Sequence, residues 1–237
     1  GRTLNLTGIT VQNGNGTGSS GGSPTTNGGC IYVRPNSVLN ISGSTVQNCT
    51  STSNGAGIYA DEDSTVVVTA ASLIRNNSAN LNGGGINMST GFITVDQNSC
   101  IENNTALNGG GIFAGDTVLI TIGGGSVSNR GFIFANTASG SGGGIYMDVN
   151  STFVGNHARF FSNTAPIGSA FFSFGGSSSS NDPNNLGRSC VDCCIVNNSG
   201  NVAVFQVLDG LNANFANNWW GSDFGPFISV APTTTAS

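Results

Sequence analysis

Few side chains in this chain could do acid–base or metal chemistry, and they are scattered. Its 237 residues include one histidine, His157, and no lysine. Hydrolysis of a glycosidic bond needs two carboxyl groups roughly 5–10 Å apart across a cleft, and only Asp61, Glu62 and Asp63 stand together. Carboxylates with turn carbonyls suit Ca²⁺, and a solvated turn is the alternative interpretation. We expect no catalytic residue and no cofactor, and these three carboxylates are the candidate for a calcium site.

The cysteines are even in number, which predicts a disulfide framework in an oxidising compartment. We expect Cys30 to pair with Cys49, because the two flank one repeat and can meet across a corner. Cys190-Val191-Asp192-Cys193 could be half of a zinc site, but a second ligand pair is lacking and a local disulfide is the simpler interpretation. The six candidates are Cys30, Cys49, Cys100, Cys190, Cys193 and Cys194, of which Cys100 has no obvious partner.

Asn-x-Ser/Thr sequons are unusually frequent. They either arise by chance in a chain rich in Asn, Ser and Thr, or carry glycans on outward turns of a secreted protein. Together with the cysteines they favour an extracellular or cell-surface setting. The nine candidate asparagines are Asn5, Asn15, Asn40, Asn48, Asn76, Asn87, Asn103, Asn150 and Asn197.

Charge and composition exclude several classes of partner. Charged residues make up 7% of the chain and the net charge is −5, which argues against nucleic acid because phosphate binding needs clustered Lys and Arg. No apolar run approaches the roughly 20 residues of a membrane span. The chain begins without Met or a signal peptide, and residues 3–11 already read as a strand, so we interpret it as a mature protein or a segment of a longer one.

The chain is built from a repeat of about 27 residues. An apolar residue, two spacers and an asparagine are followed by small residues, glycines and a new apolar strand. Because one such unit cannot bury its own apolar face, the repeat predicts a solenoid. The clearest copies are 74–77 with 83–86, 101–104 with 109–112, 133–136 with 142–145, and 160–163 with 169–171.

Each repeat contains three short β-branched segments separated by turn residues, for example 57–60, 65–69 and 72–75. This pattern predicts strands, not helices. We predict a right-handed parallel β-helix of about eight rungs, where a rung is one circuit of the chain. It should occupy 1–232 as a single domain. Loops at 13–27 and 175–187 leave the rod, an insertion lies around 123–125, and 233–237 forms an extended tail.

The repeated asparagine predicts a hydrogen-bonded column. A corner between strands needs left-handed backbone, which Asn tolerates, and stacked amides can bond along the rod. The glycine pairs serve the next corner, where positive φ or close packing excludes a Cβ. Cys49 replaces the asparagine in one repeat. The expected column is Asn77, Asn104, Asn136, Asn163, Asn198 and Asn218.

The same register places side chains on the outer face. Arg75 should stack on Glu102, and Arg34 on Asp61, although exposed ion pairs contribute only about 0–1 kcal/mol. Two residues before the column, later repeats carry an apolar strip of Phe134, Phe161 and Val196. Such a strip marks a partner surface unless the 175–187 loop folds over it.

These motifs resemble a known family. The apolar-x-x-Asn and Gly-Gly-(small)-Ile elements resemble the FxxN and GGA(I/L/V) repeats of the polymorphic outer-membrane protein family of autotransporter adhesins. Residues 217–226, Asn-Asn-Trp-Trp-Gly-Ser-Asp-Phe-Gly-Pro, resemble the NWWG…GP element that closes many right-handed β-helix domains. The resemblance covers about residues 27–226, with Ile usually standing where the family has Phe. It implies a right-handed β-helix on a surface or in an extracellular assembly.

The ends of a β-helix suggest a function. Each end is a row of unpaired backbone groups, and no N-terminal cap is legible in the sequence, so either more chain precedes Gly1 or another subunit caps the rod. A head-to-tail contact that does not close generates a filament. We therefore predict a non-catalytic extracellular structural protein that joins copies of itself or neighbouring subunits through its β-helix ends. The alternatives are a surface adhesin that binds glycans and, third, a polysaccharide-active enzyme.

Overall fold

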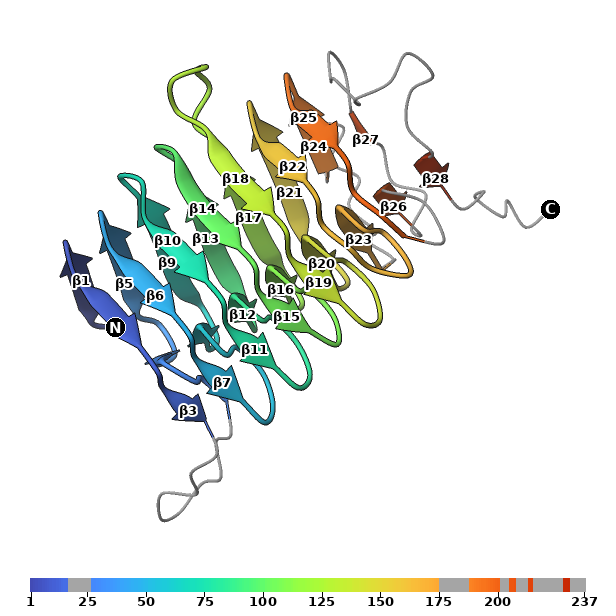
Figure 1. Cartoon of the computed structure of the whole chain (residues 1–237). Helices are drawn as coiled ribbons and strands as arrows, with labels where there is room; N and C mark the ends of the chain where they lie inside the picture. Colours follow the sequence, from blue (N-terminus) through green and yellow to red (C-terminus); the bar gives the residue numbers. More distant parts are fainter. Residues whose placement is uncertain (17–26, 175–187, 201–204, 208–212, 215–227, 231–237) are drawn as a thin grey trace.

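The protein is a parallel β-helix, which confirms the predicted fold class. The computed structural model describes residues 1–16, 27–174, 188–200, 205–207, 213–214 and 228–230. In this part of the chain there are 28 strands and no helix, and every pairing between strands is parallel. Successive rungs stack along one axis, so equivalent strands of neighbouring rungs lie side by side (Figure 1).

The strands form four sheets, which we call A to D. Sheet A contains β1 (Thr3–Thr7), β5 (Val38–Ser42), β9 (Ser64–Thr69), β13 (Gly91–Val95), β17 (Val118–Ile122), β21 (Thr152–Asn156), β24 (Arg188–Val191) and β27 (Ala213–Asn214). Sheet B contains β2 (Thr10–Gln12), β6 (Thr45–Gln47), β10 (Leu73–Arg75), β14 (Ser99–Glu102), β18 (Gly131–Phe134), β22 (Arg159–Phe161) and β25 (Cys194–Val196).

The two remaining sheets complete each rung. Sheet C contains β3 (Asn15–Gly16), β7 (Thr50–Ser51), β11 (Ser78–Ala79), β15 (Thr105–Ala106) and β19 (Thr137–Ala138). Sheet D contains β4 (Ile31–Val33), β8 (Ile58–Ala60), β12 (Ile86–Met88), β16 (Ile112–Ala114), β20 (Ile145–Met147), β23 (Phe171–Ser173), β26 (Phe205–Val207) and β28 (Ile228–Val230).

The first five rungs therefore have four strands where the sequence led us to expect three. The unexpected member is the two-residue strand of sheet C, which directly follows the corner asparagine. The expected loop at 13–27 also starts too early, because β3 pairs with β7 through Asn15↔Thr50 and Gly16↔Ser51. The remainder of that loop, the 175–187 loop, the 233–237 tail and Asn218 lie outside the described residues.

Alternation of side chains builds the core, because successive residues of a strand face opposite sides. Along sheet A, one interior position stacks from rung to rung, and from Leu39 onward its members are at most 1% exposed. Each such buried side chain contributes about 1.5–3 kcal/mol relative to exposure. This interior column is Leu4, Leu39, Val66, Ile93, Ile120 and Phe153.

One later rung fills its interior with aromatic rings. Phe153 of β21, Phe160 of β22 and Phe171 of β23 are fully buried, with ring centroids 5.9 Å apart for Phe153–Phe160 and 5.1 Å for Phe153–Phe171. On β21, a Cβ at Gly155 would lie 2.5 Å from Sγ of Cys190 and 2.9 Å from Cζ of Phe153. The cysteine sulfur and the aromatic ring thus leave no space for a side chain at this position.

Candidate functional site

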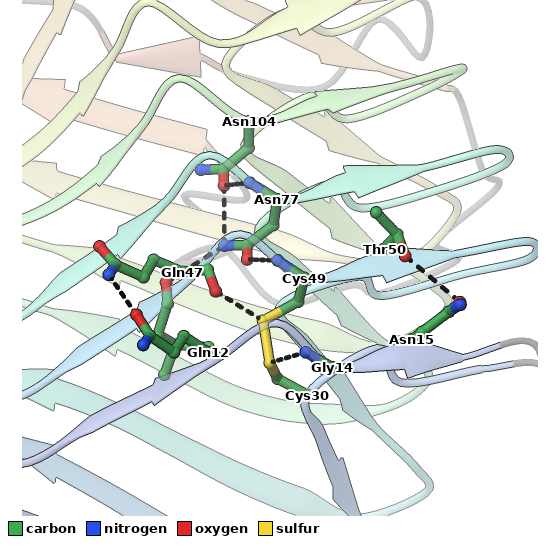
Figure 2. Close-up of a disulfide and its surroundings, with 10 residues drawn as sticks. Gln12, Gly14, Asn15, Cys30, Gln47, Cys49, Thr50, Asn77 and Asn104 are labelled. Atoms are coloured by element: carbon green, nitrogen blue, oxygen red, sulfur yellow. Dashed lines mark hydrogen bonds between the residues drawn. A yellow bond between two sulfur atoms is a disulfide. The ribbon is translucent and has the colours of Figure 1, made fainter.

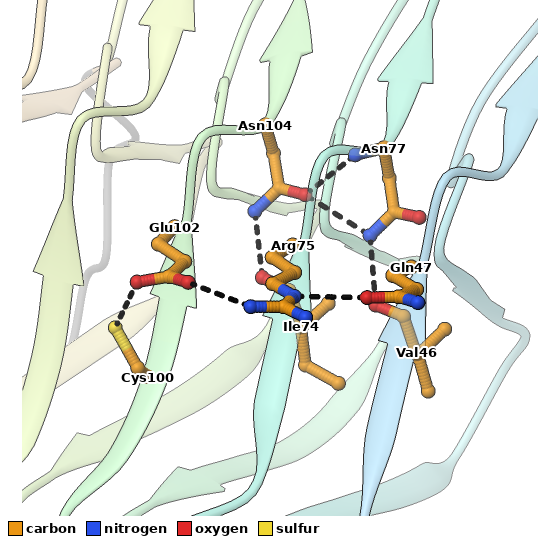
Figure 3. A network of polar contacts seen from close by, with 8 residues as sticks. All are labelled: Val46, Gln47, Ile74, Arg75, Asn77, Cys100, Glu102 and Asn104. Atoms are coloured by element: carbon orange, nitrogen blue, oxygen red, sulfur yellow. Dashed lines mark hydrogen bonds and ion pairs between the residues drawn. The ribbon is translucent and has the colours of Figure 1, made fainter. Parts of the chain in front are cut away.

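Buried amides form a continuous column at the corner between sheets B and C. Nδ2 of Asn77 donates to Oδ1 of Asn104 at 3.0 Å (Figure 3), and the contact repeats at 3.0, 3.1 and 2.9 Å as far as Asn198. Each Oδ1 also accepts the backbone N–H of the preceding member at 2.9–3.1 Å. We call Asn77, Asn104, Asn136, Asn163 and Asn198 the asparagine column.

The left-handed residue of this corner is not the column asparagine, which corrects our expectation. Positive φ belongs to the residue before it: 54° at Asn76, 53° at Asn103, 53° at Ala135 and 55° at Ser162. The column member is held by hydrogen bonds instead: Nδ2 of Asn104, for example, also donates to the carbonyl of Ile74 at 2.9 Å. The two neighbouring positions therefore have separate requirements, one for backbone conformation and one for an amide.

Glycines pack against the asparagine column from the side of sheet D. Gly83 has a φ of +65°, which a side chain would strain. At Gly85, a Cβ would lie 2.6 Å from the carbonyl oxygen of Gly111 and 3.0 Å from Nδ2 of Asn104. Within residues 83–85, positive φ thus requires a glycine at Gly83, whereas close packing requires one at Gly85.

A disulfide ends the column toward the N-terminus. Cys49 occupies the column position, and its backbone N–H donates to Oδ1 of Asn77 at 3.0 Å (Figure 2). It is bonded to Cys30, with the two Cα atoms 5.6 Å apart. This disulfide connects the first rung to the second. In the second rung it takes the place of the asparagine that would otherwise begin the column.

The other cysteines include a second disulfide, and no zinc site forms among the described residues. Cys190 is bonded to Cys193, and Cys100 and Cys194 are free thiols. Burial, helped by the nearby Glu102 carboxylate, raises the pKa of the Cys100 thiol far above its ordinary value. Cys100 is therefore chemically inert, while half-buried Cys194 is the accessible thiol of the described part.

The calcium candidate is wrong as a site. Asp61 accepts a hydrogen bond from the Tyr32 hydroxyl of the preceding rung, whereas Asp63 accepts one from Thr90 of the following rung at 3.2 Å. Their carboxylates are engaged with different rungs, and no group of three or more metal-ligating side chains occurs in the described residues.

One of the two expected charge stacks forms an ion pair. Arg75 lies 4.0 Å from Glu102 and donates through Nε to Gln47 at 2.9 Å (Figure 3). Arg34 is in register with Asp61, but no ion pair between them is found in the described part of the chain, and Asp61 bonds Tyr32 instead. Burial and this hydrogen bond raise the pKa of Tyr32 to about 12.

Most sequon asparagines lie on the outside of the rod. Asn48, Asn76, Asn103 and Asn197 are exposed at the left-handed position before the column, and Asn5, Asn15, Asn40 and Asn150 also reach the surface. Asn87 on β12 is the exception, because it is only 5% exposed. A glycan cannot be accommodated there in the folded protein, so Asn87 is removed from the candidates.

Two strips of aromatic side chains run along the outer surface. The expected strip on sheet B is half-buried because Phe134 stacks on Phe161 with ring centroids 4.6 Å apart, and Val196 follows in register. The second strip lies on sheet D, and we did not predict it. Its members each follow the apolar residue that opens a strand, and this regular spacing could have revealed the strip in the sequence. It consists of Tyr32, Tyr59, Phe113 and Tyr146, with Asn87 interrupting it, and it ends in register at Phe172, which is only 5% exposed.

The N-terminal end leaves interior side chains uncovered. Leu4 belongs to the interior column of sheet A, yet it is 51% exposed while its neighbour Leu39 is 1% exposed. A hollow of about 320 Å³ is lined there by Leu4, Ile31, Val33 and Leu39 among others. In the described residues, no strand pairs with the outer edges of β1, β2, β3 or β4.

These features define a parallel β-helix with a hydrogen-bonded corner and an uncovered end. No protein family, no curated protein and no solved structure matches the chain. The described part contains no helix with the length and apolarity that a membrane span requires. The motif resemblance to polymorphic outer-membrane proteins therefore stays a prediction.

Proposed function

We propose that the protein is a non-catalytic extracellular structural subunit whose β-helix continues end to end into a second copy. The observation that carries this proposal is the 51% exposure of Leu4, a residue of the interior column. A further rung placed on β1 would bury it as Leu39 is buried. Two disulfides in the described chain support an oxidising, extracellular setting.

The N-terminal end has the chemistry of an interface between rungs. Its strands offer unpaired N–H and C=O groups, which invite strand addition, and its hollow is lined mostly by apolar side chains. Burying one leucine contributes about 1.5–3 kcal/mol, and several interior residues are covered at once. A rung of a second copy provides matching strands because the described rungs repeat the same parallel strand register.

The experiment is sedimentation velocity and negative-stain electron microscopy of the purified chain over a wide concentration range. We expect end-to-end oligomers whose association weakens by at least about 10-fold in Leu4→Asp, because a charge would be buried at the contact. Phe92→Asp is the matched control, since Phe92 is 54% exposed on the outer face of sheet A in mid-rod.

Two results would contradict the proposal. One is an unaltered chain that stays monomeric at every concentration. The other is equal loss of association in both variants, which would locate the contact on the lateral surface. Melting curves of each variant verify that the rod itself still folds.

A surface adhesin that binds glycans is the second candidate function. It is favoured by the aromatic strip on sheet D, where Phe113 and Tyr146 stack with centroids 4.9 Å apart. Tyrosines combine an apolar ring with a hydroxyl that can bond sugar oxygens. Binding on a glycan array that disappears in Tyr59→Ala or Tyr146→Ala would support this function, and binding unchanged in both would reject the strip as the site.

A further inference from the structure

The corner between sheets A and B contains a hollow lined by basic residues. It measures about 530 Å³, and Arg130, His157 and Arg159 line it together with Asp192 and Cys193. The chain has only six Lys and Arg residues and one His in total, with a net charge of −5. Two of six arginines and the single histidine thus converge on one place in an acidic protein.

The register of sheet B explains why these residues meet. Phe132 pairs with Arg159, and Arg159 pairs with Cys194. Arg130, His157 and Asp192 each stand two residues before these partners, so they occupy the same corner position in three successive rungs. His157 and Asp192 have φ values of 56° and 53° there, which directs the chain around the corner.

An insertion supplies one wall of the hollow. The loop between β17 and β18 extends beyond the equivalent corners of the earlier rungs (Figure 1). It is closed by a hydrogen bond from Gly124 N–H to the Asn129 carbonyl at 2.8 Å, and it displays Val127, which is 63% exposed. On the opposite side, the Cys190–Cys193 disulfide fixes the corner of the later rung.

The arginines of this hollow have donors to spare. Nε of Arg130 is buried and has no hydrogen-bond partner within the described residues. Neither Arg130 nor Arg159 forms an ion pair there, whereas Arg75 on the same sheet does. A buried donor without a partner costs free energy, so an acceptor supplied from outside would stabilise this arrangement.

We propose that this hollow binds the oxyanion of an acidic saccharide, either a carboxylate or a sulfate ester. Two guanidinium groups match planar or tetrahedral oxyanions through paired N–H donors. The volume exceeds what a bare inorganic anion fills and lies in the range of small-ligand pockets. Val127 offers an apolar surface for the sugar ring. The site is separate from the N-terminal end, so it does not depend on end-to-end association.

The experiment is calorimetric titration of the full chain at low salt with two probes. A galacturonate oligosaccharide carries only carboxylates, and a heparin-derived oligosaccharide adds sulfate esters, so the tighter probe identifies the group. Arg130→Gln and Arg159→Gln should each weaken binding about 10- to 100-fold, as expected for the loss of a charge-assisted hydrogen bond. Arg75→Gln is the matched control, because it removes the same charge on the same sheet at a position outside this hollow and outside the N-terminal one.

Each outcome decides the proposal. Binding of either probe that is lost in the two hollow variants and kept in Arg75→Gln supports it. No binding of either probe, or equal weakening in all three variants, would overturn it, since the latter indicates unspecific attraction. Melting curves verify folding, and shortening the loop by removing 125–128 provides a second variant that leaves both arginines in place and should weaken binding by removing Val127.

Discussion

Two corners of the same rod follow different rules. At the corner between sheets B and C, the same residue type, asparagine, recurs in five successive rungs, and its amides bond one another throughout. At the corner between sheets A and B, the chain uses Gly43, Ala70-Ala71, Gln97-Asn98, the 123–130 loop and His157 in successive rungs. One corner is uniform in sequence and length, and the other varies in both.

The difference follows from where the polar groups of each corner are satisfied. In the first corner the donors and acceptors are buried, and they are paired by the amide of the next rung and by a backbone carbonyl of the preceding rung. In the second corner most residues are exposed to water, so no residue type is imposed and an insertion is tolerated. The regular corner stabilises the rod, and the variable corner is where the hollow lies.

The largest effect should come from breaking the asparagine column. Asn104→Ala leaves the backbone N–H and the amide of Asn77 without their acceptor, and we expect a loss of about 3–5 kcal/mol in the free energy of unfolding. Asn98→Ala at the variable corner should cost only about 1 kcal/mol, because its φ of 62° adds left-handed strain and its amide makes only an exposed bond to Ser128 at 3.3 Å. Urea unfolding measures both, and equal losses would contradict the distinction.

Glycine substitutions sharpen the same contrast with a smaller effect. Gly85→Ala should cost about 2–4 kcal/mol, because its Cβ would lie 2.6 Å from a backbone oxygen that cannot move. Gly125→Ala in the loop at the variable corner has its nearest neighbour at 3.7 Å and a φ of +78°, so only about 1 kcal/mol of backbone strain is expected. If thermal unfolding ranks the two in the opposite order, close packing at the column is not the cause.

A stabilising substitution tests the separation of the two positions at the regular corner. Ala135 has a φ of 53°, although its equivalents Asn76 and Asn103 are asparagines. Ala135→Asn should raise stability by about 0.5–1 kcal/mol by relieving left-handed strain. Ala138→Asn, at a buried position of the adjacent strand, is the control and should destabilise. If the Ala135→Asn variant were less stable than its parent, left-handed backbone conformation would not be the requirement at this position.

The smallest effect concerns the pH dependence of the variable corner. Burial raises the pKa of Asp96, which follows β13, above its ordinary value. Folding therefore favours the protonated carboxyl group. The contribution of this group to folding stability is fully present below its unfolded-state pKa of about 3.9, and it is lost as pH rises through its folded-state pKa. Asp96→Asn, which stays neutral, should melt about 1–2 °C higher than the parent at pH 7 and equally at pH 3. A gain of the same size at both pH values would exclude burial of the charge as its cause.

The repeat made the fold and the column readable from sequence, because every rung restates the same register. The fourth sheet escaped notice since strands such as Thr50–Ser51 are too short to show a period of two. Our prediction placed the left-handed backbone one residue too late, because Asn76-Asn77 and Asn103-Asn104 are each a pair of asparagines. Ala135 and Ser162 carried the missing signal, since in the repeats from Asn77 to Asn198 only the second position is always asparagine.

The surface sites were less predictable because they depend on which rung a side chain meets. Because Asp61 and Asp63 are close in sequence, we expected their carboxylates to form a cluster. In the structure each carboxylate forms a hydrogen bond to a different neighbouring rung. Conversely, Arg130 and His157 are 27 positions apart, which is one repeat, but the wall that Val127 adds comes from an insertion that the repeat does not predict. A hollow created by an insertion is a property of three rungs, and no single repeat contains it.

The asparagine column also gives the rod a direction. From Asn77 to Asn163, one N–H of each Nδ2 bonds the amide of the next rung toward the C-terminus, and each Oδ1 accepts from the N-terminal side. The column does not reach the N-terminal end, because the Cys30–Cys49 disulfide closes it there. The two sides of the column therefore differ, so the rod has a distinct front and back.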